Sequence, residues 1–265
     1  DYTGGGCPHI LAEPQRTNIV FPSDVAVTQT RTVTAVEYAL SFYGTGSIVL
    51  SGTHSATLTG TGANDRVDLI FTPTAGSLVL TVSGTITNFQ LEVGSYATSL
   101  IPTVSGQVTR NQDIFTRDGI GSLINSTEGV LFVEMAALSD DLTDRRISLN
   151  DGSVSNQIII GYSRFTGNII NEVFSGGSIQ NVNWAANGVT QTNNNKFALS
   201  WGSGTMKFYL NGLQTNIETG VTSPVGLNNL EFRIGDDTMN MFGKVKQLQV
   251  YDTALTDTQL AALTS

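Results

Sequence analysis

Alternation of apolar and polar residues is the dominant pattern of this chain, and it predicts β-strands. From Phe89 to Val93 and again from Met206 to Leu210, every second residue is apolar, which is the period of a half-buried strand. The second run ends at Asn211-Gly212, a pair typical of a type I′ hairpin turn. Residues 77–82 and 129–135 are more continuously apolar, so we expect strands that are covered on both faces, as in a sandwich.

Gly, Asn, Asp and Ser interrupt these runs every eight to twelve residues, a spacing of turns that favours sandwiches and barrels. One helix is predicted, at residues 257–263, because Thr256 and Gln259 have the spacing of a capping box. The predicted fold class is all-β, with two β-sandwich (jelly-roll) domains and one short C-terminal helix. A Pro/Ser/Gly-rich stretch at residues 102–106 marks the boundary between the domains.

The predicted organisation has three parts. Residues 1–25 form an extended lead-in segment, residues 26–104 form the first jelly roll, and residues 105–265 form the second sandwich. The chain begins at Asp1 with no Met, basic segment or apolar signal region, so we expect that more protein precedes it.

Composition and charge exclude several classes of protein. The net charge is −9, which has the wrong sign for a protein that neutralises nucleic-acid phosphates. The sequence contains no apolar run of the length that spans a membrane as a helix, so membrane insertion is not predicted either. Cys7 is the single cysteine, which excludes an internal disulfide framework and a multi-cysteine zinc site.

Catalysis finds little support in the sequence, and the protein is predicted not to be an enzyme. His9 and His54 are the only histidines. Both fall in the predicted first domain, counting the lead-in segment that lies along it, so a Ser-His-Asp arrangement in the second is not expected. Asp140, Asp141 and Asp144 could supply the paired carboxylates of a glycosidase. However, they lie in a turn-like segment where the following arginines, residues 145–146, can neutralise them.

Aromatic side chains that stack on sugar rings are the better candidates for function. Trp184 lies in a stretch rich in Asn and Gly, and a Gly-bounded segment with Tyr162 and Arg164 could neighbour it. Asn194 belongs to an Asn run whose amides suit hydroxyl groups, although such runs are also ordinary loops. These four residues are the predicted ligand-binding set. Trp201, which precedes the hairpin, is assigned to the core.

A metal site is a weaker prediction. Asp118, Asp236 and Asp237 are possible calcium ligands, because Ca²⁺ takes loop carboxylates and backbone carbonyls. An ordinary role as turn residues, such as Asx turns at strand ends, is the favoured interpretation of these aspartates. No cofactor is otherwise predicted.

The first half resembles a segment of tailed-bacteriophage structural proteins. The similar stretches are residues 1–8 (DYTGGGCP), 11–18 (LAEPQRTN) and 89–103 (FQLEVGSYATSLIPT). The third stretch closes a jelly roll similar to carbohydrate-binding modules. In that family more protein precedes the first stretch.

The second half resembles laminin-G-like (concanavalin A-like) lectin domains. The similar stretches are residues 204–212 (GTMKFYLNG), 233–235 (RIG), 242–251 (FGKVKQLQVY) and 254–256 (ALT). These are framework residues, namely turns, core strands and a cap, so no ligand-binding residue is carried over from them.

Together these features predict a non-catalytic virion protein, on a tail fibre, capsid fibre or decoration at the virion surface, that binds host-surface polysaccharide. Expected partners are other virion proteins and further copies of the chain, with a trimer as one form. Display in many copies would multiply a weak affinity for each sugar. The first alternative is an architectural virion module that binds no sugar, and the second is a polysaccharide hydrolase or lyase.

Overall fold

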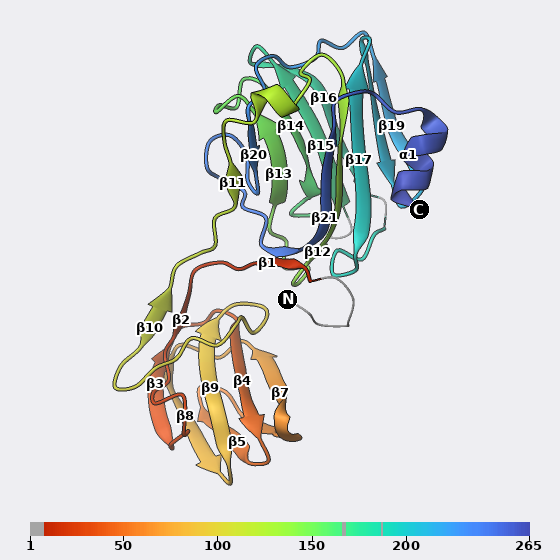
Figure 1. Cartoon of the computed structure of the whole chain (residues 1–265). Helices are drawn as coiled ribbons and strands as arrows, with labels where there is room; N and C mark the ends of the chain where they lie inside the picture. The colour runs from red at the N-terminus through yellow and green to blue at the C-terminus, as the bar shows by residue number, and fades with distance from the viewer. Residues whose placement is uncertain (1–7, 166–167, 187) are drawn as a thin grey trace. The chain divides into compact units, whose positions relative to one another are not determined.

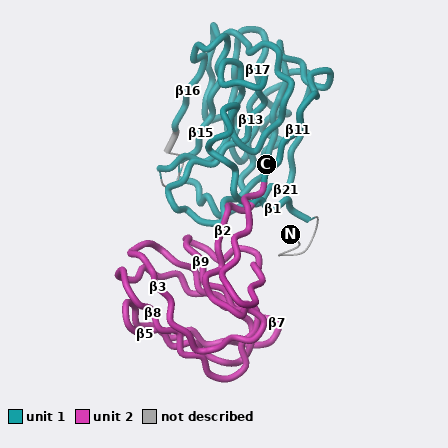
Figure 2. The backbone as a smooth tube through the Cα atoms, turned by 90° about the vertical axis from the view of Figure 1, so that its left-hand side faces the viewer, with its two compact units in different colours: residues 1–12, 114–265 teal, residues 13–113 magenta. Residues whose placement is uncertain are grey.

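The computed structural model describes residues 8–165, 168–186 and 188–265, and Cys7 lies outside the described residues. The predicted all-β class is confirmed, with one short helix, α1 (Asp257–Thr264), at the C-terminal end (Figure 1). The chain divides into two compact units, a smaller one of residues 13–113 and a larger one of residues 1–12 and 114–265 (Figure 2). No helix in the described part of the chain is long and apolar enough to cross a bilayer.

The smaller unit is a β-sandwich. One sheet has the order β3-β8-β5-β6, with bounds Gln29–Val33, Gly76–Ser83, Ser47–Gly52 and Ala56–Thr59. The other has the order β7-β4-β9, with bounds Gly62–Phe71, Tyr38–Gly44 and Ile86–Val93. The alternating apolar residues of these strands meet between the sheets, where Leu40, Phe42, Leu80, Phe89 and Leu91 form a closed core.

Strand β9 differs from its sequence pattern. Phe89 and Leu91 face the core as predicted, but Val93 is exposed and the polar Gln90 and Glu92 are fully buried. The reason is that residues 98–101 cover the second face of β9. The main-chain N–H of Thr98 donates to Glu92 Oε1 (2.7 Å), and that of Ile101 donates to Gln90 Oε1 (2.7 Å).

The ends of the smaller unit are joined by a two-stranded sheet of β2 (Arg16–Asn18) and β10 (Val108–Arg110). Because of this pairing, residues 105–113, which the sequence assigned to the second domain, lie in the smaller unit. Strand β1 (Ile10–Ala12) instead pairs with β21 of the larger unit. The lead-in segment is therefore divided between the two units, and His9, which we assigned to the first domain, lies in the larger one.

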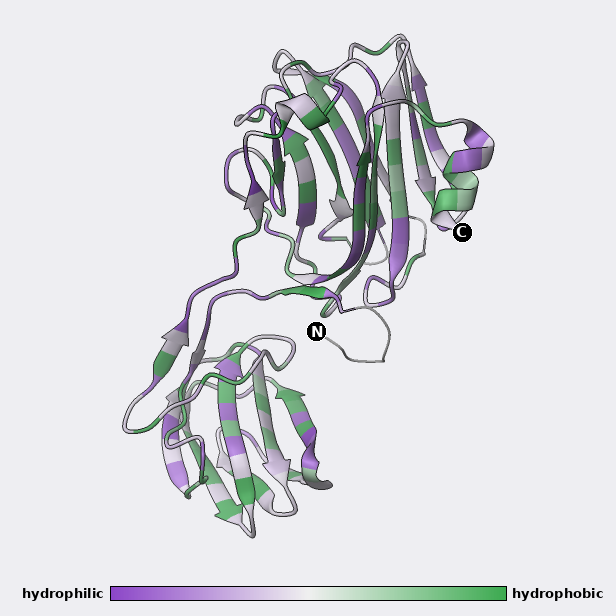
Figure 3. Ribbon diagram, in the orientation of Figure 1, coloured by the Kyte–Doolittle hydropathy of each residue, from purple (hydrophilic) through white to green (hydrophobic). Residues whose placement is uncertain are grey.

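The larger unit is a sandwich of two six-stranded antiparallel sheets. The first has the order β1-β21-β12-β17-β18-β19, where the strands after β1 span Gly243–Tyr251, Gly129–Ala137, Asn195–Gly202, Thr205–Leu210 and Leu213–Thr219. The second has the order β11-β20-β13-β14-β15-β16, spanning Thr116–Arg117, Asn229–Glu231, Arg145–Asn150, Gln157–Tyr162, Asn168–Ser175 and Ser178–Ala186. Figure 3 shows hydrophobic bands recurring along these strands.

Three local predictions in this unit are confirmed. Every residue of β12 is buried, because one face packs in the sandwich and Val130 and Phe132 on the other pack with Leu260 of α1. Asn211 (φ +48°) and Gly212 (φ +85°) both have the positive φ of a type I′ turn. Thr256 and Gln259 form both hydrogen bonds of the capping box at α1.

Candidate functional site

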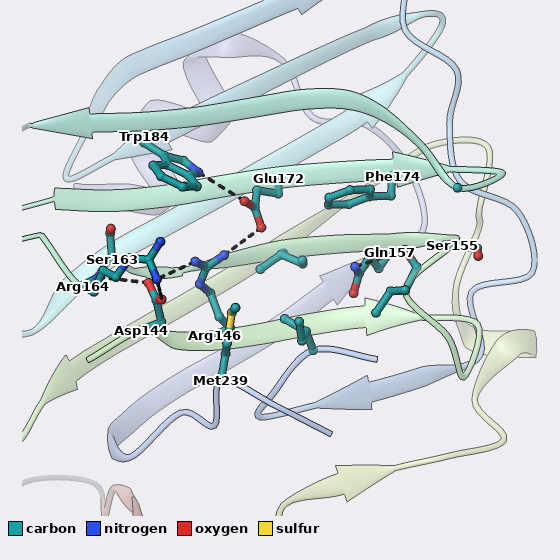
Figure 4. A pocket seen from close by; sticks show the side chains of 14 residues that line it. Asp144, Arg146, Ser155, Gln157, Ser163, Arg164, Glu172, Phe174, Trp184 and Met239 are labelled. Atoms are coloured by element: carbon teal, nitrogen blue, oxygen red, sulfur yellow. Dashed lines mark hydrogen bonds and ion pairs between the residues drawn. The ribbon is translucent and has the colours of Figure 1, made fainter. Parts of the chain in front are cut away.

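The candidate site lies on the outer face of the sheet that contains β13 to β16, where side chains alternate between the two faces. Ile147 of β13 and Ile158 and Ile160 of β14 point into the sandwich core. Because neighbouring residues of a strand face opposite sides, Arg146 and Ile159 lie on the outer face. The outer face of this sheet, with the loops at its end, forms a pocket of about 530 Å³, which we call the sheet pocket (Figure 4).

An arginine bridges two carboxylates on the wall of the sheet pocket. Arg146 Nη1 donates to Glu172 Oε2 at 2.7 Å, and Arg146 Nη2 donates to Asp144 Oδ1 at 3.1 Å. The three side chains are largely buried, where such charge-assisted hydrogen bonds are strongest. The antiparallel register brings the two side chains together. Glu172 on β15 pairs with Ile159 on β14, and β14 pairs in turn with β13, which carries Arg146. Both carboxylates are thus occupied as acceptors of one guanidinium.

Trp184 of β16 forms one side of the pocket and is 48% exposed. Its indole Nε1–H donates to Glu172 Oε1 at 3.2 Å, which links the ring to the arginine bridge. The ring of Phe165, also about half exposed, lies 6.1 Å away between centroids. A fixed, half-exposed aromatic surface of this kind is suited to stacking on an apolar face of a ligand.

Arg164 places a second positive charge beside this aromatic surface. Its main-chain N–H donates to Asp144 Oδ1 at 3.0 Å, while its side chain is 58% exposed and lies only loosely (3.9 Å) from Asp144 Oδ2. Arg164 therefore offers N–H donors to a ligand. In Figure 4, Trp184, Asp144 and Arg164 lie at one end of the pocket, which we call the charged end.

The other end, the apolar end, is built around Phe174 of β15 and Gln157 of β14, which pair in the sheet and lie together in Figure 4. Val154 and Ile234 line the pocket from two loops that are hydrogen-bonded to Gln157 at this end. Ser155 also lines the pocket here (Figure 4). Met239 lines the pocket from the same loop as Ile234, and its carbonyl accepts from the N–H of Arg146 at 3.1 Å. Its φ of +56° is uncommon for a residue with a side chain and is often found at functional sites.

The structure places the predicted ligand-binding residues in three different environments. Trp184 and Arg164 line the sheet pocket together. Tyr162 is fully buried, and its hydroxyl donates to Met135 O at 2.7 Å. Burial raises the pKa of Tyr162 well above the usual tyrosine value, outweighing the opposing effect of the hydrogen bond from Asn195. Tyr162 is thus a core residue and is not available to a ligand at the surface.

Asn194 lies elsewhere, in a second pocket that includes His9, Thr192 and Lys244. This pocket is formed by the loop between β16 and β17 and by the ends of β12 and β21. Asn194 is exposed, but it does not belong to the sheet pocket.

The three predicted metal ligands are not brought together. Asp236 Oδ1 accepts from the N–H (3.1 Å) and hydroxyl (2.6 Å) of Thr238, which is an Asx turn. Asp237 is paired with Arg233 at 2.7 Å, and Asp118 is exposed in a separate loop. Within residues 8–165, 168–186 and 188–265, no group of three or more His, Cys, Asp or Glu side chains is arranged to hold a metal ion.

Most residues of the pocket wall were not predicted from the sequence. Asp144 and Arg146 were interpreted only as part of a turn in which arginines neutralise aspartates, and the ion pair between them is confirmed. Glu172, Phe174 and Met239 carried no local signal, because their roles depend on strand register and on a loop that returns to the sheet. Trp201 is fully buried, as predicted.

Comparison with known proteins adds a family match to this geometry. Residues 132–261 match the sequence profile described as the Concanavalin A-like lectin/glucanases superfamily. No curated protein matches the chain in sequence.

Solved structures similar in fold include the CBM40 domain of the Ruminococcus gnavus IT-sialidase bound to α2,3-sialyllactose. It is 16% identical, with 57% of this chain and 98% of that chain covered and a TM-score of 0.46. Domain 4 of AbnA, a GH43 extracellular arabinanase from Geobacillus stearothermophilus in complex with arabinotriose, is 16% identical over 61% and 78% of the chains (TM-score 0.46). Galectin LEC-6 of Caenorhabditis elegans is 18% identical over 52% and 91% (TM-score 0.39). Residues 132–261 are therefore similar to concanavalin A-like lectin domains, as the laminin-G-like resemblance predicted.

Proposed function

We propose that the protein binds carbohydrate in the sheet pocket and does not act on it chemically. The observation that carries this proposal is the half-exposed Trp184, whose indole N–H is tied to Glu172 while Arg164 stands exposed at the same end. The lectin-domain match of residues 132–261 supports the same class of ligand.

A sugar ring presents two kinds of surface to a protein. A pyranose has an apolar C–H face and a rim of hydroxyl groups, so it needs a flat apolar surface and nearby hydrogen-bonding groups. Trp184 supplies the surface. The Arg164 guanidinium supplies donors at the rim, and Asp144 Oδ2, whose contact with Arg164 is loose (3.9 Å), supplies an acceptor; charged partners make such hydrogen bonds stronger than neutral ones.

The arrangement of the carboxylates supports binding over hydrolysis. A glycosidase uses one carboxyl group to protonate the leaving oxygen and another as base or nucleophile. In the sheet pocket, Asp144 and Glu172 both accept hydrogen bonds from Arg146, and Glu172 also accepts from Trp184. These bonds use the carboxylates to position the guanidinium and the indole.

A glycan array tests this proposal. Wild-type protein is expected to bind a restricted set of glycans, and Trp184→Ala is expected to lose most of that binding. Ile179→Ala is the matched control, because Ile179 is 63% exposed on the same strand but does not line the pocket. A wild type that retains no glycan would support an architectural role instead. Release of reducing ends or unsaturated uronates from a bound polysaccharide would support the hydrolase or lyase alternative.

We further propose that this binding serves attachment at the surface of a tailed-bacteriophage virion, in a homo-oligomer. The support is the resemblance of residues 1–8, 11–18 and 89–103 to phage structural proteins. Detection of the chain in purified particles by mass spectrometry and immunogold labelling would support this setting. A monomer by light scattering, together with absence from particles, would contradict it.

A further inference from the structure

The sheet pocket has two chemically different ends, and the apolar end adds information about the ligand. This inference rests on the proposed function. Trp184, Arg164 and Asp144 form the charged end, as described above. At the apolar end, Phe174, Val154 and Ile234 present hydrocarbon to the pocket.

Gln157 is the polar residue at the base of the apolar end, and its amide is turned to the protein. Its side chain is almost fully buried at the base of this end. Its Nε2 donates to Val154 O at 3.2 Å, and its Oε1 accepts from the N–H of Gly235 at 3.4 Å. The amide is therefore used to hold the two loops that carry Val154 and Ile234.

The middle of the pocket keeps the two ends at a fixed spacing. Ile159 pairs with Glu172 across β14 and β15, and Gln157 pairs with Phe174 two residues away on the same face. Met239 closes the pocket from the loop side, held through its carbonyl by the N–H of Arg146. Phe174 lies four residues along β15 from Ile170, the residue that pairs with Trp184, a distance of about 13 Å at ~3.3 Å per residue. A glycan that stacks one ring on Trp184 would therefore reach Phe174 with a substituent on a neighbouring sugar unit.

We propose that the ligand is a sugar that carries a small apolar substituent, an acyl group or the methyl group of a deoxy sugar, and that this substituent occupies the apolar end. The amide of Gln157 is already used, so Ser155 is the one described side chain at this end that could serve a ligand hydroxyl. A hydroxyl directed at Phe174, Val154 and Ile234 would give up water without a partner of equal strength. A methyl group there leaves water for a hydrocarbon surface. One such group in an apolar pocket changes affinity by about tenfold or more.

The experiment is a glycan array with matched pairs that differ in a single substituent. The pairs are N-acetylglucosamine with glucose, L-fucose with L-galactose, L-rhamnose with L-mannose, and O-acetylated glycans with their de-O-acetylated forms. We expect the bound glycans to carry the substituent, with at least about a tenfold preference over the partner that lacks it. The acyl and deoxy pairs distinguish the two sources of the apolar group.

A shape-conserving variant then assigns the preference to the apolar end. Val154→Thr replaces one methyl group by a hydroxyl at a residue that is 41% exposed, so the fold is expected to be retained. It should reduce binding of the substituted glycan severalfold and leave the unsubstituted partner unchanged. Val182→Thr is the matched control, since Val182 is 42% exposed on β16 outside the pocket lining.

The outcomes separate this inference from the proposed function. Equal binding of both members of every bound pair, or an unchanged preference in Val154→Thr, would overturn the inference while the pocket remained a glycan site. Absence of any bound glycan would contradict the proposed function itself.

Discussion

Glu92 in the smaller unit and Glu172 in the larger unit both lie on the outer face of a sandwich strand, but their hydrogen-bond donors differ. Glu92 is fully buried and accepts from Gln90 Nε2 (2.5 Å), Thr98 N (2.7 Å) and Thr98 Oγ1 (2.7 Å). Glu172 accepts from Arg146 (2.7 Å) and from the half-exposed Trp184 (3.2 Å).

The difference lies in what covers the strand. Main chain from residues 98–101 crosses β9, so the hydrogen bonds of Glu92 fasten one part of the fold to another. The donors of Glu172 are side chains that line a pocket. In this chain, the hydrogen bonds of Glu92 therefore serve the fold, whereas those of Glu172 hold side chains of the candidate site. The conspicuous 89–103 motif is framework for the same reason.

The largest expected effect comes from removing the centre of the arginine bridge. Arg146→Met leaves the carboxylates of Asp144 and Glu172 largely buried without their countercharge. We expect the free energy of unfolding of the larger unit to fall by about 3–5 kcal/mol. Urea unfolding followed by tryptophan fluorescence measures it, because both tryptophans lie in this unit.

Arg164→Met is the control for that variant. It removes an exposed guanidinium from the same end of the pocket, so its effect on stability should stay below about 1 kcal/mol. Equal losses for the two variants would mean that the bridge is no more than a surface ion pair.

Glu92→Ala is the corresponding change in the smaller unit. It leaves the donors of Gln90 and Thr98 buried without their acceptor, at a cost of about 3 kcal/mol. Hydrogen exchange of the β4 and β9 amides should speed up, while glycan binding should remain unchanged because Glu92 does not line the sheet pocket. Altered glycan binding would show that the two networks are not independent.

Trp184→Ala should separate binding from stability. Because the ring is only half buried, we expect the free energy of unfolding to change by less than about 1 kcal/mol. Affinity for a bound glycan should fall about tenfold, equivalent to roughly 1.4 kcal/mol. Isothermal titration and urea unfolding of the same preparation give both values. A large stability loss with unchanged affinity would make Trp184 a structural residue.

The smallest effect is expected at an exposed ion pair, which gives a reference for the buried networks. The pKa of Asp257 is lowered mainly by the hydrogen bond from Lys207 Nζ. Because a lowered pKa stabilises the fold when the carboxyl is ionised, the contribution is present above pH of about 4 and is lost below it. Lys207→Met should lower the melting temperature slightly at pH 7 and by less at pH 3.

Local chemistry in the sequence was sufficient for much of the fold. The turn at Asn211-Gly212 and the capping box of Thr256 and Gln259 depend on neighbouring residues, and both are confirmed. The buried polar face of β9 could not be foreseen, because the segment that covers it follows later in the chain. Its covering depends on the hydrogen bonds of Gln90 and Glu92.

The candidate site also contains residues that local sequence predicted and residues that depend on distant segments. Trp184 was predicted from its polar surroundings and Arg164 from a Gly-bounded segment that could neighbour it. The bridge between Arg146 and Glu172 was not predicted, because it joins residues 26 positions apart and requires the register of β13 to β15. The burial of Tyr162 had a usable signal, since Tyr162 continues the inward alternation of Ile158 and Ile160.

The most direct test of carbohydrate binding in the sheet pocket uses the two indole N–H signals of the chain. Trp184 lines the pocket, while Trp201 is fully buried, with its N–H donating to Asn125 O. A ¹⁵N–¹H spectrum, with Trp184→Phe to assign the signals, is recorded while a glycan retained on the array is added. We expect the Trp184 signal to shift to saturation while that of Trp201 stays in place. An unmoved Trp184 signal at saturating glycan would contradict it.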